Sequence, residues 1–99
     1  MKLSFVIYND FMDARVLELL GACGIDYYTR WERTTGKGRG TEPHLGTGGF
    51  ASTNSVLMIG FEDDAPLEKL IAKITALNAE TRRADNRIRL FQLPLERIV

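Results

Sequence analysis

The sequence predicts an α+β fold of the ferredoxin-like type, a four-stranded antiparallel sheet with two helices on one face. Three observations predict it: two amphipathic helical segments, four strand-like segments, and the order β-α-β-β-α-β, whose second half repeats the first. Right-handed crossovers place both helices on the same face of the sheet. With 99 residues, the chain forms a single domain spanning 1–99. The predicted strands cover residues 2–8, 25–33, 54–62 and 87–93.

The first half of the chain carries the signals for a strand, a helix and a second strand. Residues 2–8, KLSFVIY, alternate and are rich in β-branched and aromatic side chains, which is typical of a strand. Asn9 or Asp10 can cap the following helix, and Gly24 is a natural stop. Residues 25–33 alternate again, so we expect a strand with one polar face. The apolar face of the helix consists of Met12, Val16, Leu19, Leu20 and Cys23.

The second half repeats this order. Residues 54–62, NSVLMIGFE, predict a more buried strand. Asp63 or Asp64 can cap the second helix, and Pro66 is tolerated in its first turn. Residues 87–93, RIRLFQL, predict the last strand. The core stripe of the second helix consists of Leu67, Leu70, Ile71, Ile74 and Leu77.

The sheet face away from the helices is expected to carry Tyr27, Trp31 and Phe91. Nothing else in the chain is left to cover these side chains, which predicts an oligomer. The alternative is a face wetted by its charged neighbours.

Charge and cysteine content exclude several classes of protein. Thirteen Lys and Arg balance thirteen Asp and Glu, so broad electrostatic capture of nucleic acid is not expected. A lone cysteine, Cys23, excludes an internal disulfide and fits a reducing cytoplasm; we expect it in the core. The first ten residues do not resemble a signal peptide, and no apolar run approaches the ~20 residues of a membrane span. The expected location is cytoplasmic.

A glycine-rich stretch, TTGKGRGTEPHLGTGG at 34–49, separates the second and third predicted strands. Neighbouring strands need only a few linking residues, so a long connection indicates a functional or a disordered loop. Successive glycines allow backbone N–H groups to form an anion-binding nest, and Lys37 and Arg39 add positive charge. The spacing of a P-loop is absent. By chemistry alone, a phosphate-binding loop and a solvated hairpin remain open.

Two segments resemble nitrogen-regulatory PII proteins. GIDYYTRWERTTGKGRG is similar to the end of their second strand and the start of their long T-loop, which carries a Gly-x-Gly-Arg. ADNRIRLFQLP is similar to the family's Asp-Gly-Lys-Ile-Phe-Val stretch entering the last strand. The order of elements agrees across nearly the whole chain. The sequence is therefore identified as a divergent PII-like protein, with a T-loop at about 34–53.

The resemblance implies a homotrimer that binds an adenine nucleotide in the clefts between subunits. Gly36, Gly38 and Arg39 would hold phosphate, and Asn86 and Arg87 stand where the family has a glycine and a phosphate-binding lysine. The T-loop would relay the bound state to a protein partner, such as a membrane transporter or a carbon-uptake or carboxysome component. Arg82 and Arg83 are assigned to the dipole of the second helix instead.

Departures from the family pattern narrow the expected ligand. The T-loop is short and contains no tyrosine, so tyrosine-directed nucleotidylation is not expected there. The family's further C-terminal arginines do not follow before Val99, so AMP or ADP is expected rather than ATP. A cyclic nucleotide or a small anion such as bicarbonate would also need few cationic contacts.

Two other functions remain as alternatives. A CutA-like trimer of the same superfamily would bind metal or serve metal tolerance, with His44 as a candidate ligand. An enzyme is not expected, because the only His and the only Cys lie in different elements and form no nucleophile–base pair. An acylphosphatase would need a phosphate-cradling turn after the first strand, and YNDFMDAR lacks one.

Overall fold

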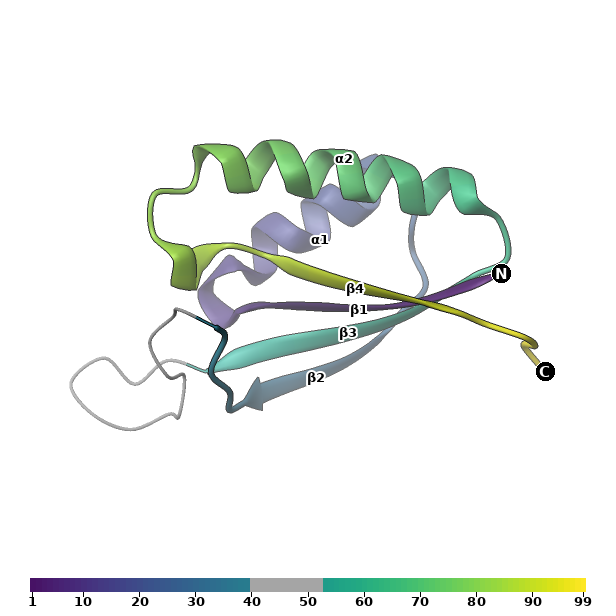
Figure 1. Cartoon of the computed structure of the whole chain (residues 1–99), viewed down its shortest axis with the longest axis horizontal. Helices are drawn as coiled ribbons and strands as arrows, with labels where there is room; N and C mark the ends of the chain where they lie inside the picture. The colour runs from purple at the N-terminus through teal and green to yellow at the C-terminus, as the bar shows by residue number, and fades with distance from the viewer. Residues whose placement is uncertain (40–52) are drawn as a thin grey trace.

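A computed structural model describes residues 1–39 and 53–99 of the chain (Figure 1). The strands are β1 (Lys2–Asn9), β2 (Thr29–Thr34), β3 (Asn54–Phe61) and β4 (Arg89–Pro94). The α-helices are α1 (Asp13–Ala22) and α2 (Asp64–Glu80), and two short 3-10 helices are η1 (Asp10–Met12) and η2 (Ala84–Asn86).

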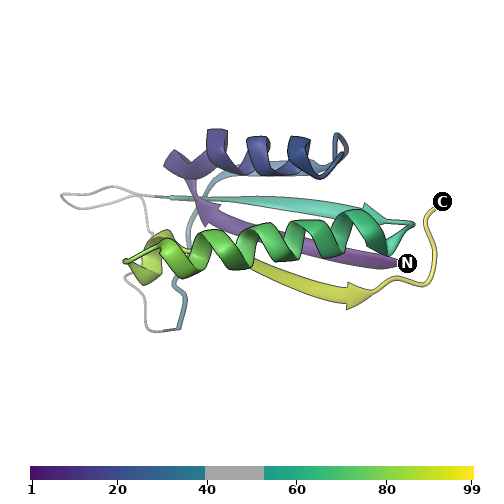
Figure 2. The same ribbon diagram turned by 90° about the horizontal axis from the view of Figure 1, so that it is seen from above.

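The four strands form one antiparallel sheet in the order β2-β3-β1-β4. The strands β2 and β4 are therefore the two edges. Both α-helices lie on the same face of the sheet, as the two views together show (Figures 1 and 2). The predicted ferredoxin-like α+β fold is confirmed.

The core lies between the helices and the sheet. Every second residue of β1 and β3 points into it, which is the alternation expected of a half-covered sheet. Its fully buried side chains include Tyr8, Phe61, Leu20, Leu57, Ile59, Leu67 and Leu70. The core stripes predicted for both helices contribute to it, with Ile71 and Leu77 partly buried against the cluster and Cys23 within it.

The first helical region begins and ends near the predicted residues. The side chain of Asn9 caps η1 by accepting a hydrogen bond from the Phe11 N–H. Gly24 has a φ of 73°, the left-handed conformation that suits glycine at a helix end. The N–H of Ile25 then donates to the carbonyl of Leu20 at 2.9 Å, so the chain is still turning at this point.

The second predicted strand begins too early, at 25 instead of Thr29. Ile25 is buried and its N–H closes the end of α1, so it cannot take part in a sheet ladder. The ring of Tyr27 makes an edge-on contact with Phe61, whose centroid is 6.2 Å away. Phe61 belongs to the helix-covered core, so Tyr27 packs toward that core. The prediction that Tyr27 shares the face away from the helices with Trp31 is therefore wrong.

The last strand also starts later than predicted, at Arg89 instead of 87. The backbone of Ile88 is held by Asn78 of α2, whose Nδ2 donates to the Ile88 carbonyl at 2.7 Å and whose Oδ1 accepts from the Ile88 N–H at 2.8 Å. These two bonds take the place of strand pairing. Of the two predicted N-caps of α2, Asp63 and Asp64, the structure has Asp63.

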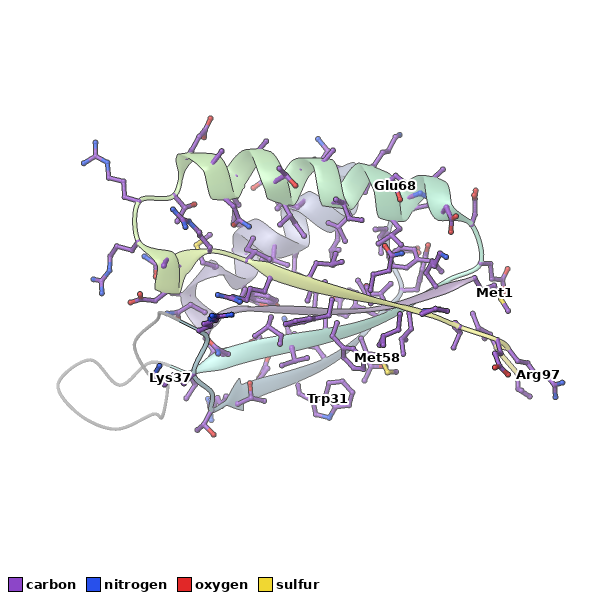
Figure 3. The ribbon with its side chains drawn as sticks, viewed as in Figure 1. Met1, Trp31, Lys37, Met58, Glu68 and Arg97 are labelled. Carbon is purple, nitrogen blue, oxygen red and sulfur yellow. The ribbon has the colours of Figure 1, made fainter. Side chains whose placement is uncertain are left out.

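The sheet face opposite the helices, here called the open face, is mostly apolar. Trp31 is 46% exposed and Phe91 is 51% exposed, in accord with the prediction for these two residues. Figure 3 shows Trp31 and Met58 on the side of the sheet away from α2. The register of the strands adds further members to the open face, which are Leu3, Phe5, Ile7, Val56 and Leu93.

Candidate functional site

Residues 34–39, here called the crossing segment, lead from one edge of the sheet to the other. They leave the end of β2 and pass the ends of the central strands toward η2 and β4 (Figures 1 and 2). The hydroxyl of Thr34 donates to the Asn54 carbonyl at 2.7 Å, which fixes the start of the segment to β3. At the other end, Nη2 of Arg89 donates to the Arg39 carbonyl at 3.4 Å.

A cleft of about 400 Å³ lies between the crossing segment, the ends of three strands and η2. Its apolar wall includes Ile7, Val56 and Phe91, all from the open face. Its polar wall contains the crossing segment itself and the residues around η2. The polar lining residues are Asn9, Thr34, Thr35, Lys37, Arg39, Asn54, Asp85, Arg87 and Arg89, with Gly36 and Gly38.

Four of the five residues predicted to bind phosphate line this cleft. Gly36, Gly38 and Arg39 lie on the crossing segment, and Arg87 follows η2 on the opposite side. Asn86 is the exception: it is half-buried in η2, its N–H donates to the Arg83 carbonyl at 3.1 Å, and it is not among the lining residues. The structure therefore brings together two segments that are about fifty residues apart in sequence.

Three charged lining residues are not among the five predicted nucleotide ligands, although Lys37 is expected from the sequence to add positive charge to the glycine-rich stretch. Arg89 and Lys37 add positive charge to the cleft, and Asp85 adds one carboxylate. The alternation of β4 could have placed Arg89 on the same face as Phe91, two residues on. No pattern in the sequence reveals that the crossing segment passes in front of that face.

The cleft concentrates positive charge in a chain with no net charge. The described residues that line it include one carboxylate, Asp85, and four cationic side chains, which are Lys37, Arg39, Arg87 and Arg89. That carboxylate is also paired with the exposed Arg83, at 3.0 Å. Guanidinium and ammonium groups around a partly apolar cavity suit an anionic ligand that also has an apolar part.

The surroundings of Gly36, one glycine of the site, leave room for a larger residue among the described atoms. A Cβ on Gly36 would come no closer than 3.6 Å to Nδ2 of Asn54, an ordinary contact. Its φ is not in the left-handed region either. Among the residues that the structure describes, nothing therefore opposes a side chain at Gly36.

Asp10, which follows β1 directly at this end of the sheet, is engaged in several hydrogen bonds. Asp10 accepts from the hydroxyl of Ser55 at 2.5 Å and from that of Thr53. Its N–H also donates to the Thr53 carbonyl at 3.0 Å. These bonds fix the start of β3 against η1, and with it one wall of the cleft.

A second network joins β1, α1 and β2 on the helix-covered side. The hydroxyl of the buried Tyr8 donates to Asp13 at 2.6 Å, and Arg30 donates to the other oxygen of that carboxylate at 2.7 Å. Arg30 also pairs with Glu32 at 2.7 Å. Burial raises the pKa of the Tyr8 phenol above its ordinary value, and the hydrogen bond to Asp13 raises it further. Tyr8 is therefore neutral and acts as a donor.

Within residues 1–39 and 53–99, no three His, Cys, Asp or Glu residues are arranged so that they could hold a metal ion. His44, the candidate metal ligand, lies outside the described residues, as does most of the predicted T-loop. In the described part of the chain, neither helix is long and apolar enough to cross a membrane.

The fold and the cleft together define a ferredoxin-like domain with a cationic cleft at one end of its sheet. A comparison with solved structures finds this fold in a crystal structure described as a "putative PII-like signaling protein" from Thermus thermophilus. The match has a TM-score of 0.59 and 15% sequence identity, and it covers 93% of this chain and 83% of that one. The resemblance to PII-like proteins is thus confirmed at the level of the fold. No family model matches the sequence, and no curated protein matches it.

Proposed function

We propose that the chain is a PII-like regulatory protein, cytoplasmic and without catalytic activity, that binds an adenine nucleotide in the cationic cleft. The observation that carries the proposal is the convergence of four cationic side chains, Lys37, Arg39, Arg87 and Arg89, on one cleft. Its volume of about 400 Å³ lies within the range of small-molecule sites, about 300–1,000 Å³. The fold shared with a PII-like signalling protein adds support.

The division of the cleft suggests how a nucleotide would be oriented. Phosphate oxygens suit the guanidinium groups of Arg39 and Arg87, which can each donate two parallel hydrogen bonds. The exposed ring of Phe91 offers an apolar surface on which a base could stack. AMP and ADP need fewer cationic contacts than ATP and remain the preferred candidates, with cyclic nucleotides and bicarbonate as further ligands to be tested.

The experiment is thermal unfolding with AMP, ADP, ATP, cyclic AMP, bicarbonate and divalent metals in turn. A ligand that binds only the folded state stabilises it by about 2.7 kcal/mol at a hundredfold excess over its Kd. For a domain of this size, that raises the melting temperature by roughly 10 °C or more. If none of the nucleotides raises it, the proposed function is wrong.

Paired variants test the location of the site. Arg39→Ala and Arg87→Ala each remove one positive charge from the cleft and should weaken nucleotide binding. Arg82→Ala removes the same charge from an exposed position that does not line the cleft, so it serves as the matched control. Equal affinities for all three variants would place the ligand elsewhere.

We also propose that the open face mediates assembly into a homotrimer, so that neighbouring subunits complete the clefts. The support is an apolar surface that includes Trp31, Phe91 and Leu93, the last 45% exposed. Sedimentation at micromolar concentration measures the assembly state. Leu93→Glu should dissociate the assembly, whereas Ala79→Glu on the exposed side of α2 should not. A wild-type monomer would contradict this part of the proposal.

The T-loop at about 34–53 would then present the bound state to a protein partner, such as a transporter or a component of carbon uptake. Its first residues line the cleft, so a ligand there would contact the loop directly. The metal-binding alternative has no observation in its favour among the described residues. The metal arm of the unfolding experiment separates it from nucleotide binding.

A further inference from the structure

Arg89 connects the two opposite edges of the sheet. It is the first residue of β4 and lies opposite Ile7, on the open face. Its Nη2 donates to the carbonyl of Arg39, which ends the described part of the crossing segment. Since that segment starts from β2, at the other edge, the contact holds its far end against β4.

This contact is weak and uses little of the side chain's capacity. Its length of 3.4 Å exceeds the usual 2.7–3.2 Å of an N–H···O bond. A guanidinium carries five N–H donors in a rigid fork, and the carbonyl of Arg39 occupies one of them. Arg89 also lines the cleft, so its remaining donors can serve an anion there without releasing Arg39.

Arg87 lines the same cleft but has no such connection. Its Nε donates to the Thr81 carbonyl at 3.3 Å, within the segment that joins α2 to β4. The two arginines therefore offer the same charge to a ligand, and only Arg89 has a hydrogen bond to the crossing segment among those described for them. They form a natural pair for comparison.

We propose that Arg89 bridges ligand and crossing segment, holding a phosphate group in the cleft and the Arg39 carbonyl with one guanidinium. This inference rests on the proposed function and concerns its regulation. A charge-assisted bond to phosphate is about twice as strong as a neutral one, so the ligand orders the Arg89 side chain. Once that side chain is ordered, the bond to Arg39 costs less conformational entropy, and the crossing segment is held more firmly. Ligand binding is thereby coupled to the start of the T-loop.

The test is amide hydrogen exchange in residues 35–39, with and without ADP, in the wild type, Arg89→Ala and Arg87→Ala. Each protein is measured at an ADP concentration that saturates it, so that differences in affinity do not enter. We expect ADP to slow exchange about fivefold or more in the wild type, the lower end of typical coupling between sites. Arg87→Ala should retain this slowing, and Arg89→Ala should lose most of it.

The outcomes separate the Arg89 bridge from the nucleotide site itself. Full slowing in Arg89→Ala, or loss of slowing in Arg87→Ala, overturns the bridge while the nucleotide site stands. If ADP does not bind the wild type at all, the proposed function fails and the bridge fails with it. Both arginines are exposed, so both variants should fold; their melting curves without ligand check this.

Discussion

The two hydrogen bonds between Asn78 and the backbone of Ile88 make Asn78→Ala the most informative single substitution. Ile88 is buried, lies outside any strand, and stands between Arg87 and Arg89, two of the three described arginines that line the cleft. Its N–H and its carbonyl both depend on the Asn78 side chain. The substitution therefore leaves two backbone groups without their partner in a place where water has little access.

The expected cost is about 2–4 kcal/mol. Two hydrogen bonds contribute about 1 kcal/mol each, and buried groups left unsatisfied cost about 1–3 kcal/mol each, so the sum depends on how far water enters. This is a large part of a typical stability of about 5–15 kcal/mol. It corresponds to a fall in melting temperature of roughly 8 °C or more.

Urea unfolding followed by circular dichroism measures this change in the free energy of unfolding. Thr75→Ala is the matched control, because Thr75 lies one turn earlier on α2 and its exposed hydroxyl donates only to the Ile71 carbonyl of the same helix. We expect the control to change the free energy by no more than ~0.5 kcal/mol. If Asn78→Ala lowers the free energy of unfolding no more than Thr75→Ala does, the two bonds from Asn78 to Ile88 do not stabilise the fold as argued.

Three further predictions concern the scaffold. The folded protein keeps the Tyr8 proton above pH 10.0, the ordinary pKa, where the unfolded chain loses it. The free energy of unfolding should therefore fall as pH rises beyond that point, by up to ~1.4 kcal/mol per pH unit. Tyr8→Phe lacks the phenol and should lose this part of the pH dependence. Urea unfolding at each pH measures the difference between the two proteins. Gly24→Ala forces a side chain into a φ of 73° and should cost ~1–2 kcal/mol by the same assay; an unchanged midpoint contradicts it. Gly21→Ala, with open space at a helical site, should raise the melting temperature through a gain of ~0.5–1 kcal/mol, and a fall contradicts it.

Much of the fold follows from local patterns in the sequence. The alternation of β1 and β3 and the apolar stripe of α2 each report which side of an element is buried, and the structure agrees with them. The two misplaced boundaries have one cause. At Ile25 and at Ile88 the backbone bonds to another element before the strand begins, so side-chain alternation extends further than the ladder.

The cleft was predictable only in part, for a different reason. Composition and family resemblance pointed to Gly36, Gly38, Arg39 and Arg87, each within a short motif. Whether two motifs meet depends on the path of the chain after β2, which is set by contacts such as Thr34 with Asn54. Arg89 belongs to the same segment as Arg87, but no position of the family pattern marks it as a ligand, so it could be assigned to the site only once that path was known.

The net charge of the chain also says little about how its charges are arranged in space. Zero net charge argues against broad capture of polyanions, but it does not describe a single cleft. Asp10 is occupied by the hydroxyls of Ser55 and Thr53, and Asp13 by Tyr8 and Arg30, so neither carboxylate is directed at the cleft's arginines. Internal pairing of these acids thus leaves cations in excess at one end of a neutral protein. Such an arrangement favours a small anion with several oxygens over a long polyanion, because the attraction is confined to the cleft.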